Sequence, residues 1–158
     1  MKNFLILMTK ILNLRVSQIS PQQTKALRHL VLWPHIEKEE DCVIDIDNRA
    51  DAVHLAAFDG DRIVSIGSLF QMDNSKIDFK RQYRLRAMAT HPDYRGKNAG
   101  RALVEFALDH LKKQEVEVLW CDAREVAVGF YESIGFEKLP EKYDIPKIGP
   151  HYFMWKVI

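Results

Sequence analysis

Leu85–Gly100 reads LRAMATHPDYRGKNAG, and this stretch decides the fold. Its first part is the apolar end of a predicted strand over residues 77–90, which His91-Pro92 terminates. A glycine-bearing loop, Tyr94 to Gly100, then leads into an amphipathic helix. The first backbone N–H groups of such a helix have no partner within it, and the helix dipole adds positive potential. A strand–loop–helix junction of this kind is suited to binding phosphate.

Positive charge is concentrated around this loop. The 80–101 segment has a net charge of +6, whereas the whole chain has 23 basic and 22 acidic residues and a net charge of +1. The 37–47 segment supplies the opposite charge, with six acids against Lys38. This distribution favours one compact anion over a nucleic acid, which needs a more uniformly basic surface. The basic residues of the first segment are Lys80, Arg81, Arg84, Arg86, Arg95, Lys97 and Arg101, against Asp93 alone.

Two other kinds of phosphate-binding loop do not match. A P-loop requires lysine and then serine or threonine after its last glycine, but Arg101 and Ala102 follow Gly100. A dinucleotide-binding loop requires three glycines, and only Gly96 and Gly100 are present. An ordinary helix start with a solvated run of charges stays open as the alternative.

The segment resembles the acyl-coenzyme A signature of the GNAT N-acetyltransferase superfamily, Arg/Gln-x-x-Gly-x-Gly/Ala. Arg95 and Gly100 match its two ends, and the 88–92 sequence MATHP matches the strand that precedes it. Asn98 occupies the position of the central glycine. Asparagine tolerates left-handed backbone angles, so we expect the loop to keep its shape while the side chain crowds the pyrophosphate.

A second block, Cys121–Phe136, reads CDAREVAVGFYESIGF and is similar to a later motif of the same superfamily, Asn-x-x-Ala-x-x-Phe-Tyr-x-x-x-Gly-Phe. The matching positions are Ala127, Phe130, Tyr131, Gly135 and Phe136. Arg124 stands where asparagine is often found. In the Asn-Ala-Arg version of the motif, Asp122 replaces the asparagine, which leaves one pantetheine hydrogen bond open. The resemblance covers about residue 14 to the C-terminus.

Hydrophobic periodicity and turn residues predict the other elements. Ser20-Pro21-Gln22-Gln23 and Asp122-Ala-Arg-Glu125 read as capping boxes that open helices, and Gly135 as a helix end. Asp59-Gly60-Asp61 predicts a hairpin. We expect the core side of the 101–113 helix to carry Leu103, Phe106, Ala107 and Leu111, and that of the first helix Leu27, Leu30 and Val31. The predicted strands span residues 12–19, 53–58, 62–72, 77–90, 116–121, 136–143 and 151–157.

The order of these elements predicts one α/β (α+β) domain over residues 1–158, with 1–11 as an added N-terminal strand or extension. The resemblance implies the acyl-CoA N-acyltransferase (GNAT) fold, a central mixed and mostly antiparallel sheet flanked by helices. It also implies an acetyl-CoA-dependent N-acetyltransferase, in which a primary amine attacks the thioester directly in a ternary complex.

The resemblance assigns roles residue by residue. The backbone N–H groups of Met88 and Ala89 are expected to polarise the thioester, and Tyr131 to protonate the coenzyme A thiolate as the catalytic residue. On a helical wheel Tyr131 lies at the edge of the apolar face formed by Ala127, Phe130 and Ile134. The expected coenzyme A-binding residues are Met88, Ala89, Thr90, Arg95, Gly96, Lys97, Asn98, Ala99, Gly100, Arg101, Asp122, Arg124, Phe130 and Tyr131.

The acceptor amine is not readable from the sequence. His35 and His151 are the candidate substrate residues, with a structural role as the alternative for each. The acidic 37–47 segment is a candidate for attracting a cationic acceptor, with a solvated loop as the alternative. A non-catalytic acyl-CoA-binding or regulatory module, and an enzyme that uses a longer acyl-CoA, remain alternative functions.

Composition bounds the remaining properties. Cys42 and Cys121 are the only cysteines and lie far apart, which favours a reducing, cytoplasmic location over a disulfide-bonded secreted domain. No apolar run approaches the roughly 20 residues of a membrane span. No histidine, cysteine and acid cluster has metal-ligand spacing, so we expect no metal. We expect a monomer or homodimer that binds acetyl-CoA and an amine, but neither nucleic acid nor membrane.

Overall fold

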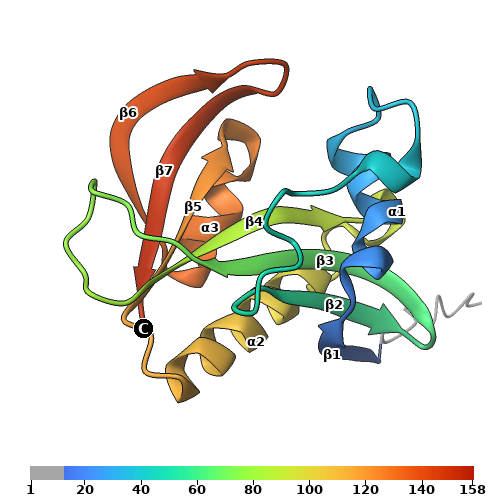
Figure 1. The fold of residues 1–158 in the computed structure, drawn as a ribbon, viewed down its shortest axis with the longest axis horizontal. Helices are drawn as coiled ribbons and strands as arrows, with labels where there is room; N and C mark the ends of the chain where they lie inside the picture. The colour runs from blue at the N-terminus through green and yellow to red at the C-terminus, as the bar shows by residue number, and fades with distance from the viewer. Residues whose placement is uncertain (1–12) are drawn as a thin grey trace, which may run out of the picture.

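The computed structural model describes residues 13–158, and the expectation for residues 1–11 lies outside them. The described chain forms one seven-stranded sheet in the order β1-β2-β3-β4-β5-β7-β6 (Figure 1). Only β4 and β5 are parallel neighbours, so the predicted mixed, mostly antiparallel sheet is confirmed. The strands are β1 (Leu14–Ile19), β2 (Val53–Asp59), β3 (Arg62–Gln71), β4 (Gln82–Thr90), β5 (Val118–Arg124), β6 (Glu137–Ile145) and β7 (Gly149–Val157).

Helices cover both faces of the sheet. After β1, a helical stretch over residues 21–32 includes the single α-helical turn α1 (Lys25–Leu27). The longer helix α2 (Ala99–Lys113) follows β4, and α3 (Val128–Ile134) follows β5. On β2, Leu55 packs in the cluster of α2 whereas its neighbour Ala56 packs in the cluster of α1. Since successive strand residues point to opposite faces, α1 and α2 lie on opposite sides of the sheet.

The buried side of each helix differs in part from the prediction. On α2, Leu103, Ala107 and Leu111 are buried as expected, but Val104 is buried as well and Phe106 is exposed. Leu103, Val104, Ala107 and Leu111 follow the i, i+1, i+4, i+8 spacing of one narrow face, and Phe106 lies beside it. Leu30 is also exposed, so its assignment to the core was wrong.

The two predicted capping boxes have opposite outcomes. At Ser20 the box is present, because the Gln23 side chain accepts from the Ser20 backbone N–H at 2.9 Å. Asp122 caps no helix, since residues 121–124 are still paired with β7 and the backbone stays extended through Arg124. Gly135 ends α3 with a φ of 102°, as predicted. The strand predicted from residue 77 begins at Gln82.

The strands β4 and β5 separate soon after they begin. Their paired register covers only Gln82–Arg84 against Val118–Trp120. Beyond this point the two strands diverge, and each leads toward the start of a helix (Figure 1). Because the strands are parallel, their carboxyl ends open at the same edge of the sheet. The divergence leaves space between the ends of the two strands.

Strand β4 also carries a bulge three residues beyond its last pair with β5. Ile66 pairs with Ala89 and Ser68 with Arg86, so Ala87 and Met88 both stand opposite Gly67. Ala87 has a φ of 52°, a left-handed backbone that is rare for alanine. A side chain at Gly67 would meet Leu103, Met88 and Leu85 at 3.0 to 3.3 Å, so packing supports the bulge from behind. A bulge of this kind re-aims the backbone and is common beside functional sites.

Candidate active site

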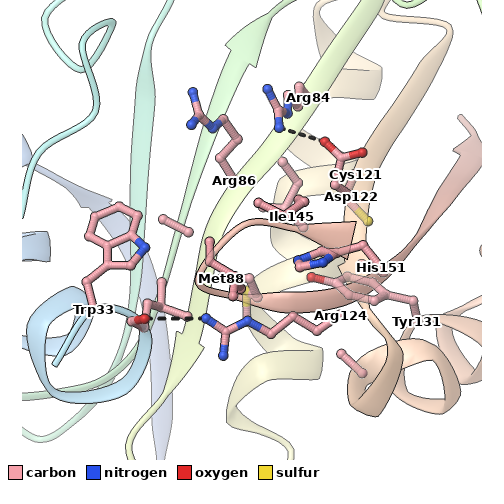
Figure 2. Close-up of a pocket in the computed structure, with 16 residues that line it drawn as sticks. Trp33, Arg84, Arg86, Met88, Cys121, Asp122, Arg124, Tyr131, Ile145 and His151 are labelled. Atoms are coloured by element: carbon pink, nitrogen blue, oxygen red, sulfur yellow. Dashed lines mark hydrogen bonds and ion pairs between the residues drawn. The ribbon is translucent and has the colours of Figure 1, made fainter. Parts of the chain in front are cut away.

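A cavity of about 260 Å³ lies between the diverging ends of β4 and β5 (Figure 2). Strand β4 contributes Arg84, Arg86 and the two bulge residues, and β5 contributes residues 121–124. Tyr131 of α3 and His151 of β7 line it as well. Apolar side chains complete the wall: Leu32 and Trp33 after the first helical stretch, and Ile145 and Ile148 around the β6–β7 turn.

The sequence predicts Tyr131 at the edge of the apolar face of α3, but Tyr131 is buried. The helix turns its ring toward β5. The ring contacts Phe130 and Phe136 edge-on, at centroid distances of 5.0 and 5.2 Å. Tyr131 and Cys121 of β5 line the same cavity. Burial raises the pKa of Tyr131 well above 10, and the neighbouring Cys121 adds to the effect. The hydroxyl therefore keeps its proton at neutral pH and is available as a hydrogen-bond donor.

Cys121 behaves as a buried apolar residue, as the sequence predicts. It is 2% exposed, and burial raises the pKa of its thiol far above the usual range, with Asp122 contributing. A thiol that stays protonated is a poor nucleophile.

The charged groups of the cavity are unevenly paired. Arg84 donates to Asp122, with 2.7 Å between Nη2 and Oδ2, and stacks on Trp120. Tyr143 of β6 donates a second hydrogen bond to Asp122. Burial raises the pKa of Tyr143, and the bond to Asp122 raises it further. Within residues 13–158, Arg86 makes no hydrogen bond or ion pair that would neutralise it.

Asp122 thus has a role that the sequence did not indicate. It joins β4, β5 and β6 through Arg84 and Tyr143, whereas the motif comparison placed it against pantetheine. Arg84 and Arg86 were grouped with the glycine loop as charge for one anion, but they lie at this cavity instead. Their alternation with the buried Tyr83 and Leu85 was the signal that both face the same side of β4.

A second cavity of about 260 Å³ lies at the N-terminus of α2. Most of the predicted coenzyme A residues meet here: Thr90, Arg95, Gly96, Asn98, Ala99, Gly100, Arg101 and Phe130, together with Tyr94 and Ser133. The Lys97 ammonium lies over the Tyr94 ring, 5.5 Å from its centroid, and Lys97 does not line this cavity. Ala89 is buried and lines neither of these two cavities.

Asn98 and Gly100 shape this second cavity. Asn98 has φ 65° and ψ 9°, the left-handed conformation that the sequence predicts. A Cβ at Gly100 would approach Thr90 Oγ1 to 3.2 Å and the Met88 and Phe130 side chains to 3.3 Å. Met88 lines the first cavity and Phe130 the second, so Gly100 packs where the two cavities come together.

The two candidate histidines differ. His151 is buried and lines the first cavity, where its ring stacks near Tyr143. His151 Nδ1 lies 2.7 Å from the Gly149 carbonyl oxygen. Since a carbonyl only accepts, Nδ1 carries the proton and Nε2 is left as an acceptor. His35 is exposed and lines a separate pocket beside Trp33 and Ile148.

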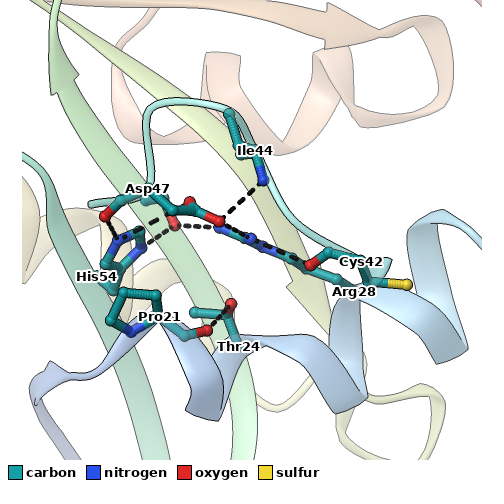
Figure 3. Close-up of polar contacts among 8 residues, drawn as sticks. Pro21, Thr24, Arg28, Cys42, Ile44, Asp47 and His54 are labelled. Carbon is teal, nitrogen blue, oxygen red and sulfur yellow. Dashed lines mark hydrogen bonds and ion pairs between the residues drawn. The ribbon is translucent and has the colours of Figure 1, made fainter. Parts of the chain in front are cut away.

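A buried polar cluster surrounds Arg28 (Figure 3), and the Arg28 guanidinium lies 5.8 Å from the centroid of the Trp33 ring. Arg28 donates to both Asp47 oxygens, at 2.7 and 2.9 Å, and to Ser68 at 3.1 Å. His54 bridges Ser68 and the Asp47 carbonyl. Burial by itself would raise the pKa of Asp47, but the hydrogen bonds from Arg28 and the Ile44 N–H outweigh it and hold this pKa below its usual value.

The acidic 37–47 segment therefore serves the fold in part. Asp47 neutralises Arg28 inside the protein, and no residue of the segment lines the first cavity. A cationic acceptor would meet arginines there and not these acids.

Among residues 13–158, no group of three or more histidine, cysteine and acidic side chains is arranged to hold a metal ion. No helix in the same range is both long and apolar enough to cross a membrane.

Comparison with known proteins identifies the family. The Acetyltransferase (GNAT) family model matches residues 18–136. The uncharacterized N-acetyltransferase YitI of Bacillus subtilis (strain 168) is 35% identical over 145 residues, which cover 92% of this chain and 97% of that protein. The ribosomal protein bS18-alanine N-acetyltransferase of Escherichia coli (strain K12) is 41% identical over 54 residues, 32% of this chain and 36% of that protein.

Solved structures agree on the fold. The crystal structure of an aminoglycoside 6'-N-acetyltransferase complexed with coenzyme A superposes with a TM-score of 0.71 at 14% identity, and the match covers 90% of this chain and 96% of that one. The family model spans most of the described residues, and the relative from Bacillus subtilis matches nearly end to end. The chain therefore belongs to the GNAT family and is an acyltransferase.

Proposed function

We propose that this acyltransferase is an N-acetyltransferase that moves an acetyl group from acetyl-CoA to a primary amine. The observation that carries the proposal is the position of Tyr131. Its protonated hydroxyl lies in a cavity whose other wall is the β4 bulge, beside a second cavity at a helix N-terminus. When bound, acetyl-CoA supplies an activated acetyl thioester.

The second cavity suits the phosphate end of the coenzyme. The free N–H groups at the start of α2, with Arg95 and Arg101, would hold the pyrophosphate, and Lys97 stands nearby. Thr90, Ala99, Gly100 and Phe130 line the way toward the first cavity. A methyl group at Gly100 would press on Thr90, Met88 and Phe130, which line the two cavities.

The first cavity suits the reaction itself. Met88 lies outside the regular β3–β4 register and lines the first cavity, and we assign its backbone N–H to the negative charge that develops on the acyl oxygen. The Tyr131 hydroxyl donates a proton to the leaving sulfur. An alkylammonium has a pKa of about 10, so a base must first remove a proton from the acceptor. We assign that role to Nε2 of His151.

The test is an acceptor screen. The purified protein is incubated with acetyl-CoA and a panel of amines, amino acids, aminoglycosides and peptides while free thiol is followed. Amine-dependent thiol release with N-acetylated product supports the proposal. Calorimetric binding of acetyl-CoA without release on any amine supports a non-catalytic module instead. Faster turnover of propionyl- or succinyl-CoA than of acetyl-CoA indicates a longer acyl donor.

A further inference from the structure

Arg86 is the charged side chain of the first cavity that has no hydrogen-bond or ion-pair partner within residues 13–158. It projects from β4 on the same side as Arg84, two residues along the strand (Figure 2). Arg84 is neutralised by Asp122, and Arg124 donates to the Leu32 carbonyl at 3.4 Å. Arg86 has no such partner among residues 13–158, although its side chain is partly buried.

The cavity consequently carries unbalanced positive charge. Its wall holds Arg84, Arg86 and Arg124 against the single carboxylate of Asp122, which already serves Arg84 and Tyr143. Burial lowers the pKa of Arg86, and the charge of Arg84 lowers it further. A guanidinium stays protonated even so, and a partly desolvated cation without a partner attracts an anion. The surroundings of Arg86 thus favour a bound anionic group.

The position of Arg86 relates this anion to the acceptor. Arg86 precedes Met88 by two residues, and the bulge at Ala87 keeps their Cα atoms no more than about 7 Å apart. An amine placed at the bulge therefore has Arg86 within the length of a short molecule. Trp33 and Ile148 line both this cavity and the pocket beyond it, and so mark the outer limit of the cavity.

We propose that the acceptor is a small amine that also carries an anionic oxygen group, carboxylate or phosphate, which Arg86 binds. Free amino acids and aminoalkyl phosphates are of this class. The proposal rests on the proposed function, because it names the acceptor of that same reaction. It disfavours polycationic acceptors, which would bring a second ammonium beside Arg84 and Arg86.

The first experiment compares matched acceptors at fixed acetyl-CoA. β-Alanine and glycine are set against β-alaninamide, glycinamide and propylamine, and phosphoethanolamine separates phosphate from carboxylate. A tripeptide with a neutral C-terminal amide tests a protein N-terminus as acceptor. We expect kcat/KM for the anionic acceptors to exceed that of their neutral partners by about 10- to 100-fold, as one charge-assisted interaction allows.

Variants then locate the effect. Arg86→Gln should abolish the preference, mainly through a higher KM for the anionic acceptor, while KM for acetyl-CoA changes less than about twofold. Arg86→Lys should retain part of it, since the charge stays but the planar donor pair is lost. Arg15→Gln is the control, because Arg15 is exposed on β1 at the edge of the sheet. This variant should show the same preference for anionic acceptors and the same KM values as the wild type.

The outcomes separate this proposal from the proposed function. Equal turnover of anionic and neutral amines, or a tripeptide amide better than both, overturns the role of Arg86 while acetyl transfer stands. The same holds if Arg86→Gln weakens acetyl-CoA binding instead of acceptor use. If no amine is turned over, the proposed function fails. Calorimetry that compares the binding of N-acetyl-β-alanine with that of its amide then still tests the anion site at Arg86. Equal binding of those two compounds overturns the anion site.

Discussion

Arg84 on β4 and Asp122 on β5 form an ion pair, 2.7 Å between Nη2 and Oδ2, just beyond the point where the two strands part. Register between the strands ends at Arg84 and Trp120, and Asp122 lies two residues past Trp120. Backbone pairing no longer joins the two strands here, and the side-chain ion pair links them instead. Tyr143 donates to the same carboxylate, which connects the outer strand β6 to this point.

Asp122→Asn should lower the free energy of unfolding by about 1–2 kcal/mol, because Arg84 and Tyr143 lose a charged acceptor. Urea denaturation measures the loss. Asp109→Asn is the matched control, since Asp109 pairs with Lys113 on the exposed side of α2. The control should change stability by no more than about 0.5 kcal/mol. A loss at Asp122 no larger than the control would show that the pair does not hold the strands.

Asp47→Asn should cost more, about 3–5 kcal/mol at pH 7, because Arg28 would be left as a buried charge. The pKa of Asp47 is below its usual value in the folded protein. Its contribution to stability is therefore complete above the unfolded pKa of about 4 and is lost as the pH falls through the folded pKa. The gap between wild type and variant should narrow below pH 4 in guanidinium titrations. A constant gap from pH 7 to pH 3 would contradict this.

The sequence predicts the individual strands, the turns and the glycine loop well because they depend on local signals. The capping residues at Ser20, the Asp59-Gly60-Asp61 turn and Gly135 act within a few residues of themselves, and each appears as expected. The left-handed backbone of Asn98 follows from its own side chain in the same way.

The acceptor side depends on contacts between distant segments, and there the sequence is a poor guide. Asp122 satisfies the local pattern of a helix cap, but pairing with β7 keeps it in a strand. There its carboxylate accepts hydrogen bonds from Arg84 and Tyr143. Asp47 lies in an acidic run that indicates a solvated loop, yet Arg28 binds it inside the protein. Neither partner is visible without the fold.

Tyr131→Phe should lower kcat by about 100-fold or more while KM for acetyl-CoA changes little. The ring and its contacts with Phe130 and Phe136 are retained, so only the hydroxyl is lost. Steady-state kinetics with the best amine from the screen gives both constants. Tyr83→Phe is the control, because Tyr83 is buried on β4 and lines neither the first nor the second cavity. Full activity of Tyr131→Phe would remove its hydroxyl from the mechanism.

His151→Gln should lower kcat/KM about 10- to 100-fold near pH 7, because Gln cannot take a proton from the acceptor. The deficit should shrink toward pH 9.5, where more of the amine is already neutral. A pH–rate profile of wild type and variant checks this, with His35→Gln as the control on the exposed histidine. A deficit that is independent of pH would point to packing against Tyr143 and not to proton transfer.

Gly100→Ala should weaken acetyl-CoA binding at least tenfold and lower stability by about 1–3 kcal/mol. The added methyl group would press on Thr90, Met88 and Phe130 at once. Gly129→Ala is the matched control, since no atom of residues 13–158 is found within 4 Å of its Cβ position and its backbone is helical. That variant should bind acetyl-CoA normally and be as stable as the wild type or slightly more stable. Calorimetry and thermal unfolding give both quantities.

Asn98→Gly restores the central glycine of the loop motif, and so removes a side chain where Gly100→Ala adds one. Asn98 holds a φ of 65° at the start of α2, and its side chain caps no backbone N–H group there. Glycine adopts this backbone without strain and removes the side chain from the cavity that Asn98 lines. We therefore expect acetyl-CoA to bind several-fold more tightly, with thermal stability unchanged or slightly higher. Weaker binding would mean that the Asn98 amide is itself a ligand of the coenzyme, because removal of its hydrogen bond would then outweigh the space that is gained.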